Sequence, residues 1–171
     1  MELLYFFLGL AALVVVVLGL FALGWRGRRR RQQDMPRPLP VPEDLSEPGF
    51  QALGQYVVTT TAGDWLDRVA QYGLGVKSNA TAAVFPEGLL FARSGAEDLW
   101  IPKSDLRAVR LERGMAGKFV EKDGLVTVTW QLGPKRVDTG FRTRAGSDKT
   151  PLVNAITKLL PESAAPSEEQ L

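Results

Sequence analysis

The hydrophobic positions of the chain fall into three regions with different patterns. The first region, Leu3 to Leu23, is 21 residues long and carries no charged side chain. A helix of this length, at about 1.5 Å per residue, spans the roughly 30 Å hydrocarbon core of a bilayer. It also lacks the polar face that a helix of a soluble protein presents to water. Residues 1–25 are therefore predicted to form one transmembrane helix.

The charges that flank this segment predict its orientation. Only Glu2 precedes it, whereas Trp25 and five arginines follow it: Arg26, Arg28, Arg29, Arg30 and Arg31. Basic residues stay on the cytoplasmic side, and Trp favours the membrane interface. We expect these six residues to contact the membrane surface, where basic side chains attract anionic headgroups. The prediction is a single-pass plasma-membrane protein with its N-terminus outside and its C-terminal domain in the cytoplasm.

A cleaved signal peptide is the alternative for the same segment, because Ala22-Leu23-Gly24 offers small residues at a suitable spacing. A signal peptide, however, carries its positive charge before a shorter apolar run. The order and length found here favour an anchor.

The second pattern is rich in proline and lies directly behind the arginines. Prolines occupy positions 36, 38, 40, 42 and 48, and they remove backbone donors and disfavour helix. Residues 26–49 are predicted to be a basic, proline-rich and semi-rigid linker. At the other end, residues 161–171 are rich in Ser, Ala, Pro and Glu and are predicted to be a disordered tail.

The third pattern, in residues 50–160, predicts short strands followed by one helix. Val126, Val128 and Trp130 alternate with Thr127 and Thr129, the period of a sheet with one polar face. Strands are expected over 55–61, 80–85, 89–93, 98–102, 106–112, 118–121, 125–132 and 136–141. Thr150 to Leu160 has apolar residues at helical spacing and predicts an amphipathic helix. About seven strands and a closing C-terminal helix give a mainly β fold with the outline of a pleckstrin-homology-like (PH-like) roll.

Two segments have a less regular pattern. Trp65 to Tyr72 is predicted to be a short helix or a loop that packs Trp65 and Val69 inward. Imperfect alternation near Asp105 predicts a bulge or a helical turn.

Composition narrows the classes of function. The chain has no cysteine and no histidine, which removes thiol nucleophiles, the commonest zinc ligands and the usual general base near neutral pH. From Phe50 to Leu160 there are 15 Lys plus Arg and 11 Asp plus Glu, a mild excess that is unlike a nucleic-acid-binding surface. We expect no catalysis, no cofactor, no metal and no nucleic-acid partner.

One triplet, Asp138-Thr139-Gly140, matches the catalytic sequence of aspartic proteases. Those enzymes bring two such aspartates together, whereas one copy is present here and the bulky Phe141 follows it. Asp138 and Thr139 are expected instead to pair with backbone groups or with Arg142 at a strand end.

Several short blocks, taken in order, resemble the actinobacterial membrane-anchored PH-like domain proteins. They are Trp65-Leu66-Asp67-Arg68, Gly73-Leu74-Gly75, Gly114 to Lys118, Val128-Thr129-Trp130, and Val137 to Arg142, which contains Asp138, Thr139, Gly140 and Phe141. The resemblance implies a PH-like fold at the inner face of the plasma membrane. Members of that family are often labelled transporters or exported proteins, but a single helix has no interior through which a solute could pass.

The leading hypothesis is a non-catalytic interaction or scaffold module that positions an unknown membrane or cytoplasmic protein. Two alternatives stay open: the domain itself binds anionic lipid or an envelope precursor, or the chain is an accessory subunit of a transport system. Basic residues collect at positions 107, 110, 113, 118 and 122 and at 135, 136, 142 and 144. A solvated face is the preferred interpretation of these residues, with an anionic-lipid surface as the second. The sequence does not predict an oligomeric state.

Overall fold

The computed structural model describes residues 5, 7, 9–20, 35–112, 114–115, 118–119 and 124–161. The chain forms two compact units that divide between Asp34 and Met35. In the first unit the described residues are helical and exposed. No helix within the described ranges is long and apolar enough to cross a membrane. Trp25 and the five arginines of the predicted membrane-surface contact lie outside those ranges.

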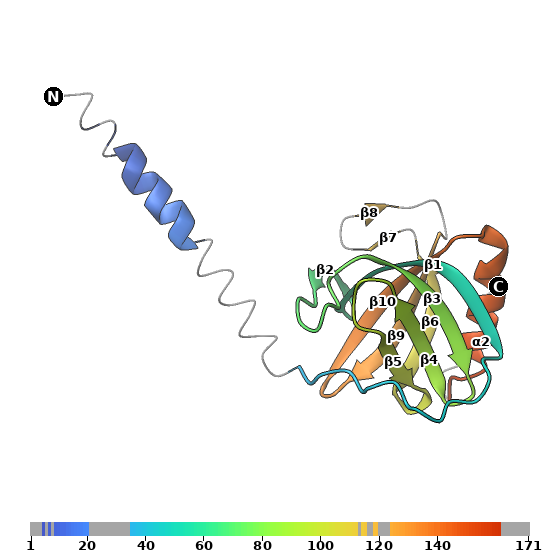
Figure 1. Cartoon of the computed structure of the whole chain (residues 1–171). Helices are drawn as coiled ribbons and strands as arrows, with labels where there is room; N and C mark the ends of the chain where they lie inside the picture. Colours follow the sequence, from blue (N-terminus) through green and yellow to red (C-terminus); the bar gives the residue numbers. More distant parts are fainter. Residues whose placement is uncertain are drawn as a thin grey trace, which may run out of the picture. The chain divides into compact units, whose positions relative to one another are not determined.

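The second unit is built on one antiparallel sheet with the strand order β5-β4-β3-β1-β10-β9-β6 (Figure 1). Its strands are β1 (Phe50–Thr61), β3 (Ser78–Phe85), β4 (Gly88–Arg93), β5 (Leu99–Pro102), β6 (Leu106–Glu112), β9 (Leu125–Leu132) and β10 (Lys135–Thr143). β2 (Asp64–Arg68) pairs with β1 beside this path, and β7 (Gly114–Met115) and β8 (Lys118–Phe119) form a separate pair. The mainly β prediction is confirmed.

The first strand joins the two halves of the sheet. Its N-terminal part, from Phe50, pairs with β3, and the part from Gly54 onward pairs with β10. The register shifts between Tyr56 and Val58, and such a bulge bends a strand and increases its twist.

One helix, α2 (Lys149–Thr157), buries Leu152 and Ile156 against the sheet. It contacts β1, β3 and β6, although β3 and β6 are four strands apart in the sheet order. Four strand spacings of a flat sheet cover about 19 Å, which is wider than a helix of about 10 Å. The sheet is therefore curled around its core, and the predicted closing helix is confirmed (Figure 1).

Residues 35–49, here called the strap, begin the second unit and lie against its sheet. Met35 is 2% exposed and belongs to the main core. Val41 and Leu45 pack on Ala83, Phe85 and Trp100, on the face of β3 and β5 that points away from that core. The Gly49 N–H then donates to the Val84 carbonyl at 2.9 Å, directly before β1 begins.

The close fit of the strap also depends on a glycine in the β9–β10 turn. Gly133 has a φ of +57°, and a Cβ there would lie 2.5 Å from Pro36 Cγ. The sequence predicts a semi-rigid linker as far as residue 49, whereas the compact unit of the structure begins at Met35. Alternating prolines predict the extended backbone, but they do not indicate that the apolar residues between them have a surface to cover.

Two local expectations have different outcomes. The predicted helical turn near Asp105 is present as a 3-10 turn at Lys103–Asp105, followed by a register shift in β6. The interpretation of Trp65 to Tyr72 as a helix or inward-packed loop is wrong for Trp65, because residues 64–68 form β2 and Trp65 is 47% exposed. Val69 is buried as expected.

Candidate functional site

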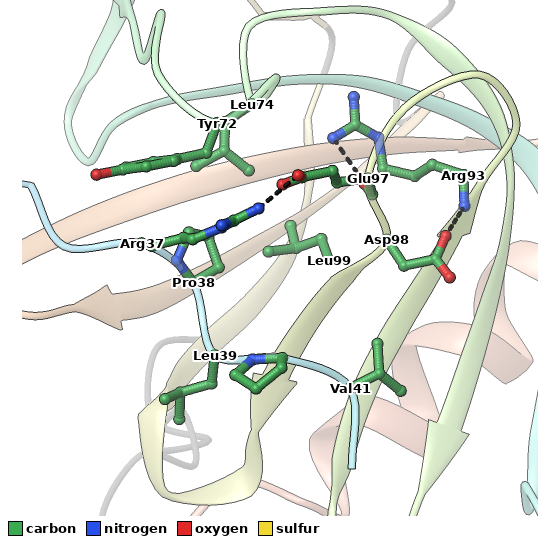
Figure 2. Close-up of a pocket in the computed structure, with 11 residues that line it drawn as sticks. Arg37, Pro38, Leu39, Val41, Tyr72, Leu74, Arg93, Glu97, Asp98 and Leu99 are labelled. Atoms are coloured by element: carbon green, nitrogen blue, oxygen red, sulfur yellow. Dashed lines mark hydrogen bonds and ion pairs between the residues drawn. The ribbon is translucent and has the colours of Figure 1, made fainter. Parts of the chain in front are cut away.

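A cavity of about 520 Å³ lies where the strap, the loop after β2 and the β4–β5 turn meet (Figure 2). Its apolar lining includes Leu39 and Val41 of the strap together with Leu74 and Leu99. Leu74 and Leu99 are about 1% exposed and belong to the main core. The cavity therefore reaches the core of the domain, and strap residues form one of its walls.

Four charged side chains also line the cavity: Arg37, Arg93, Glu97 and Asp98. Arg37 forms an ion pair with Glu97, and both side chains are more than 60% exposed. The hydrogen bond to Glu97 raises the pKa of Arg37. Exposed pairs of this kind contribute little to stability, so this contact can exchange with other polar groups at little cost.

Arg93 is different because it is buried, at 6% exposure, and holds the loop after β2 in place. Its Nη2 donates to the carbonyls of Gly73 and Val76, both at 2.8 Å, and its Nε donates to Ser78 Oγ. The guanidinium carbon lies 3.9 Å from the ring centroid of Tyr56, a cation–π distance. Arg93 thus joins the end of β4 to the loop.

The charge of Arg93 is not neutralised by a close carboxylate. Among the described residues, none places a carboxylate oxygen within ion-pair distance of this guanidinium. The nearby Asp98 carboxylate accepts the backbone N–H of Arg93, at 2.7 Å, and not its side chain. Burial lowers the pKa of Arg93, while Tyr56 and Asp98 oppose that effect. The remaining Nη1 bond, to the Glu97 carbonyl, is long at 3.4 Å. A buried positive charge therefore faces the cavity (Figure 2).

Tyr72 forms part of the same wall in an unusual backbone conformation. Its φ is +53°, the one positive value of a non-glycine residue in the described part of the chain. Such a conformation costs of order 1 kcal/mol or more and persists where surrounding contacts enforce it. The Tyr72 hydroxyl donates to the Met35 carbonyl at 3.2 Å. The strained loop therefore contacts the strap as well as the cavity.

Behind the cavity, buried polar side chains form a continuous hydrogen-bonded chain. Trp130 Nε1 donates to Thr139 Oγ1, which contacts Thr59 Oγ1 at 2.7 Å. The Thr59 hydroxyl contacts the Tyr56 hydroxyl, which donates to the Leu74 carbonyl at 2.9 Å. Thr139 and Trp130, two of the family-motif residues, therefore support the loop that lines the cavity.

A second candidate surface is β2 itself. Trp65 is 47% and Leu66 is 59% exposed, although neighbouring residues of a strand point to opposite faces. β2 pairs with β1, and its other edge pairs with none of the described strands. In the same motif, Asp67 accepts a hydrogen bond from Thr61 at 2.8 Å, and Arg68 is exposed. Large apolar side chains on an unpaired edge are typical of a docking surface.

The Asp138-Thr139-Gly140 triplet forms a structural network. Asp138 is 4% exposed and accepts hydrogen bonds from Arg110 Nη2 at 2.8 Å and from Thr129. Of the two expected partners, the backbone is present, because the Gly63 N–H donates to Asp138 at 3.4 Å. The ionic partner is Arg110 of β6 and not Arg142. Burial lowers the pKa of Arg110, but its bonds with Asp138 and Glu112 outweigh this and raise it overall. The Asp138 carboxylate is therefore occupied by structural hydrogen bonds to Arg110 and Thr129.

The predicted basic face is divided by the fold. Arg110 is held in this network, and Arg107 donates to the carbonyls of Ser104 and Leu106. Arg142 and Arg144 line a second, smaller cavity of about 230 Å³. The side chains of Arg113, Lys118 and Lys122 lie outside the described ones. Within the described part of the chain, no cluster of three acidic residues could hold a metal.

The fold brings together some of the predicted motif residues and separates others. Asp138, Thr139, Gly140, Phe141 and Trp130 meet across the β9–β10 pair, with Phe141 in the core and Arg142 exposed on the surface. Trp65, Asp67 and Arg68 lie on β2 instead. Sequence reasoning missed Arg37, Tyr72 and Arg93. Arg37 and Tyr72 belong to segments without a regular pattern, whereas Arg93 ends the predicted strand 89–93, in which the alternation does not mark it as a site residue.

Comparison with known proteins agrees with this fold. A comparison with curated proteins finds no match. A solved chain described as "Vav1 inhibited by an allosteric inhibitor: Vav1 inhibitors block GEF activity" is similar at 14% identity and a TM-score of 0.39. The match covers 68% of this chain but 27% of the other, and it supports no functional argument. The family model for bacterial PH domain-like proteins matches residues 32–157. The chain therefore belongs to the bacterial PH domain-like family, whose fold is in general an interaction module.

Proposed function

We propose that this chain is a membrane-anchored interaction module whose PH-like domain positions a protein partner at the cytoplasmic face of the plasma membrane. The uncharged run Leu3 to Leu23 and the arginines that follow it support the anchor and its orientation. The absence of Cys and His from the whole sequence supports a role without catalysis. A scaffold that recruits the partner, including an accessory role in transport, fits the same arrangement.

The observation that carries the proposal is the exposed pair Trp65 and Leu66 on the unpaired edge of β2. Trp is among the residues most enriched at the energetic centres of protein interfaces. An exposed strand edge also offers backbone donors and acceptors to an added strand. A partner that adds a strand beside β2 would therefore cover both the edge and the two apolar side chains.

The second candidate is binding of an anionic lipid or envelope precursor. It is favoured by the cavity that Arg142 and Arg144 line, because guanidinium groups recognise phosphates and carboxylates. Near β2 this alternative is weaker, because Asp64 and Asp67 flank the two apolar residues and would be repelled by anionic lipid.

Photo-crosslinking in living cells tests the proposal. A benzophenone amino acid replaces Leu66 in the full chain, and the matched control carries it at Leu53, which is 57% exposed on β1. We expect one protein adduct from position 66 and none from position 53. The yield should fall about tenfold or more with Trp65→Ser, because a central aromatic residue dominates such contacts.

The other outcomes are equally informative. A lipid adduct from position 66, or from a benzophenone at Arg144, would favour the second candidate. Equal adducts from positions 66 and 53, or a yield that Trp65→Ser leaves unchanged, would contradict docking on β2.

A further inference from the structure

We propose that the cavity under the strap is a binding site for an amphipathic organic anion, a molecule with an apolar body and one carboxylate or phosphate group. This site is distinct from the β2 surface and from the pair Arg142 and Arg144, with which it shares no lining residue. Binding there would also hold the strap on the domain, because strap residues form one wall.

The first argument is electrostatic. Arg93 is buried, faces the cavity and lacks a carboxylate partner among the described residues. A buried cation is costly unless it is paired, and its bonds to neutral groups compensate only in part. A ligand anion at the long Nη1 contact with Glu97 O would supply the missing charge.

The second argument concerns the entrance of the cavity. Arg37 already holds a carboxylate, that of Glu97, in an exposed ion pair. A ligand carboxylate can replace Glu97 because such a pair is weak and exchanges readily. Arg37 and Arg93 would then face the anionic group from the strap and from β4.

The third argument comes from the apolar lining of the cavity and from the strained backbone of Tyr72 beside it. Leu74 and Leu99 provide a core-like floor for an apolar body, and Leu39 provides a cover that is 56% exposed. Tyr72 keeps a strained backbone conformation at this wall, and backbone strain concentrates at ligand-binding sites. A cavity of about 520 Å³ lies within the usual range for small-molecule sites.

The alternative interpretation is that Arg93 only holds the loop and that the cavity has no ligand. The two interpretations differ in the roles of Arg37 and Glu97. For a purely structural ion pair, replacing either partner has the same small effect. For an anion site, Arg37→Gln weakens binding, whereas Glu97→Gln strengthens it because the competing carboxylate is gone.

The test uses the full chain in phosphatidylcholine nanodiscs, with hexanoate as the probe and leucine-methyl NMR as the readout. We expect a saturable shift of the Leu74 and Leu99 signals with hexanoate, and none with hexanamide or hexylamine. Arg37→Gln should weaken hexanoate binding about tenfold and Glu97→Gln should strengthen it, while the control Arg136→Gln, at an exposed position that lines neither cavity, leaves it unchanged. Amide exchange at Leu39 and Val41 should slow when hexanoate binds.

Two further arms identify the source of the anion. Hexyl phosphate tests a phosphate headgroup, and nanodiscs that contain phosphatidylglycerol without hexanoate test a membrane lipid. A saturable response in any of the anionic arms, with opposite effects of the two variants, supports the site. No saturable response, an equal response to hexanamide, or equal effects of Arg37→Gln and Glu97→Gln would overturn it.

Discussion

At the scale of residues, a few buried polar side chains fix the loop that lines the cavity. Tyr56 is fully buried and joins Thr59 to the Leu74 carbonyl. Arg93 stacks on its ring and holds the carbonyls of Gly73 and Val76. These bonds connect β1 and β4 to a loop that has no regular secondary structure of its own. The shape of the candidate site therefore depends on polar contacts inside the domain.

The first prediction concerns the phenol of Tyr56. Burial raises its pKa to about 12, against smaller opposing effects of Thr59 and Arg93, whereas an unfolded chain has the ordinary value near 10. The folded state thus keeps its proton between about pH 10 and 12, while the unfolded state loses it. The contribution of Tyr56 to the free energy of unfolding is therefore fully present below pH 10. It decreases by about 2 to 3 kcal/mol as the pH rises to 12.

Urea unfolding followed by circular dichroism between pH 9 and 12 measures this effect. Tyr56→Phe should lower the free energy of unfolding at pH 9 by about 1 to 2 kcal/mol, because hydrogen bonds are lost. It should also make the decline toward pH 12 shallower. Identical pH slopes for the two proteins would show that Tyr56 does not titrate in this way.

At the scale of elements, sequence patterns predicted the strands well and the irregular segments poorly. Alternation located β9 because Val126 and Val128 face the core, and helical spacing located α2. Trp65 was placed inward because large apolar residues are usually buried, yet β2 leaves it exposed. The strap was predicted to be part of a semi-rigid linker, because proline spacing does not reveal the surface of Phe85 and Trp100 that Val41 covers. Burial of these segments depends on contacts distant in sequence.

The strap gives the second prediction, with a matched pair of substitutions in one segment. Met35 is 2% exposed and Leu39 is 56% exposed. Met35→Ala should lower the free energy of unfolding of the domain by about 2 to 4 kcal/mol, because it leaves a gap in the core. Leu39→Ala should change it by about 0.5 kcal/mol or less, as expected for an exposed position.

Urea titration of both variants in the full chain checks this prediction. Equal and small effects of Met35→Ala and Leu39→Ala would mean that the strap does not belong to the folded domain. The linker would then extend to residue 49, as the sequence pattern suggests.

At the scale of the whole molecule, a proposed membrane anchor precedes a PH-like domain in the chain. The domain could be predicted from its strands and closing helix, and the match over residues 32–157 agrees with it. The partner could not be predicted, because recognition depends on which side chains the fold exposes, such as Trp65. Hydropathy alone carries the prediction of the anchor. The side of the membrane on which the domain lies determines which partners and ligands can reach the two proposed sites.

The central claim is that the domain is anchored at the cytoplasmic face of the plasma membrane. A single-cysteine experiment tests it most directly, because the chain contains no cysteine. Ser147→Cys places a thiol at an exposed position before α2, and a membrane-impermeant maleimide is applied to intact and to permeabilised cells. We predict that the protein stays in the membrane fraction after a carbonate wash and is labelled only after permeabilisation. Labelling in intact cells, or release into the soluble fraction, would contradict a domain anchored at the cytoplasmic face.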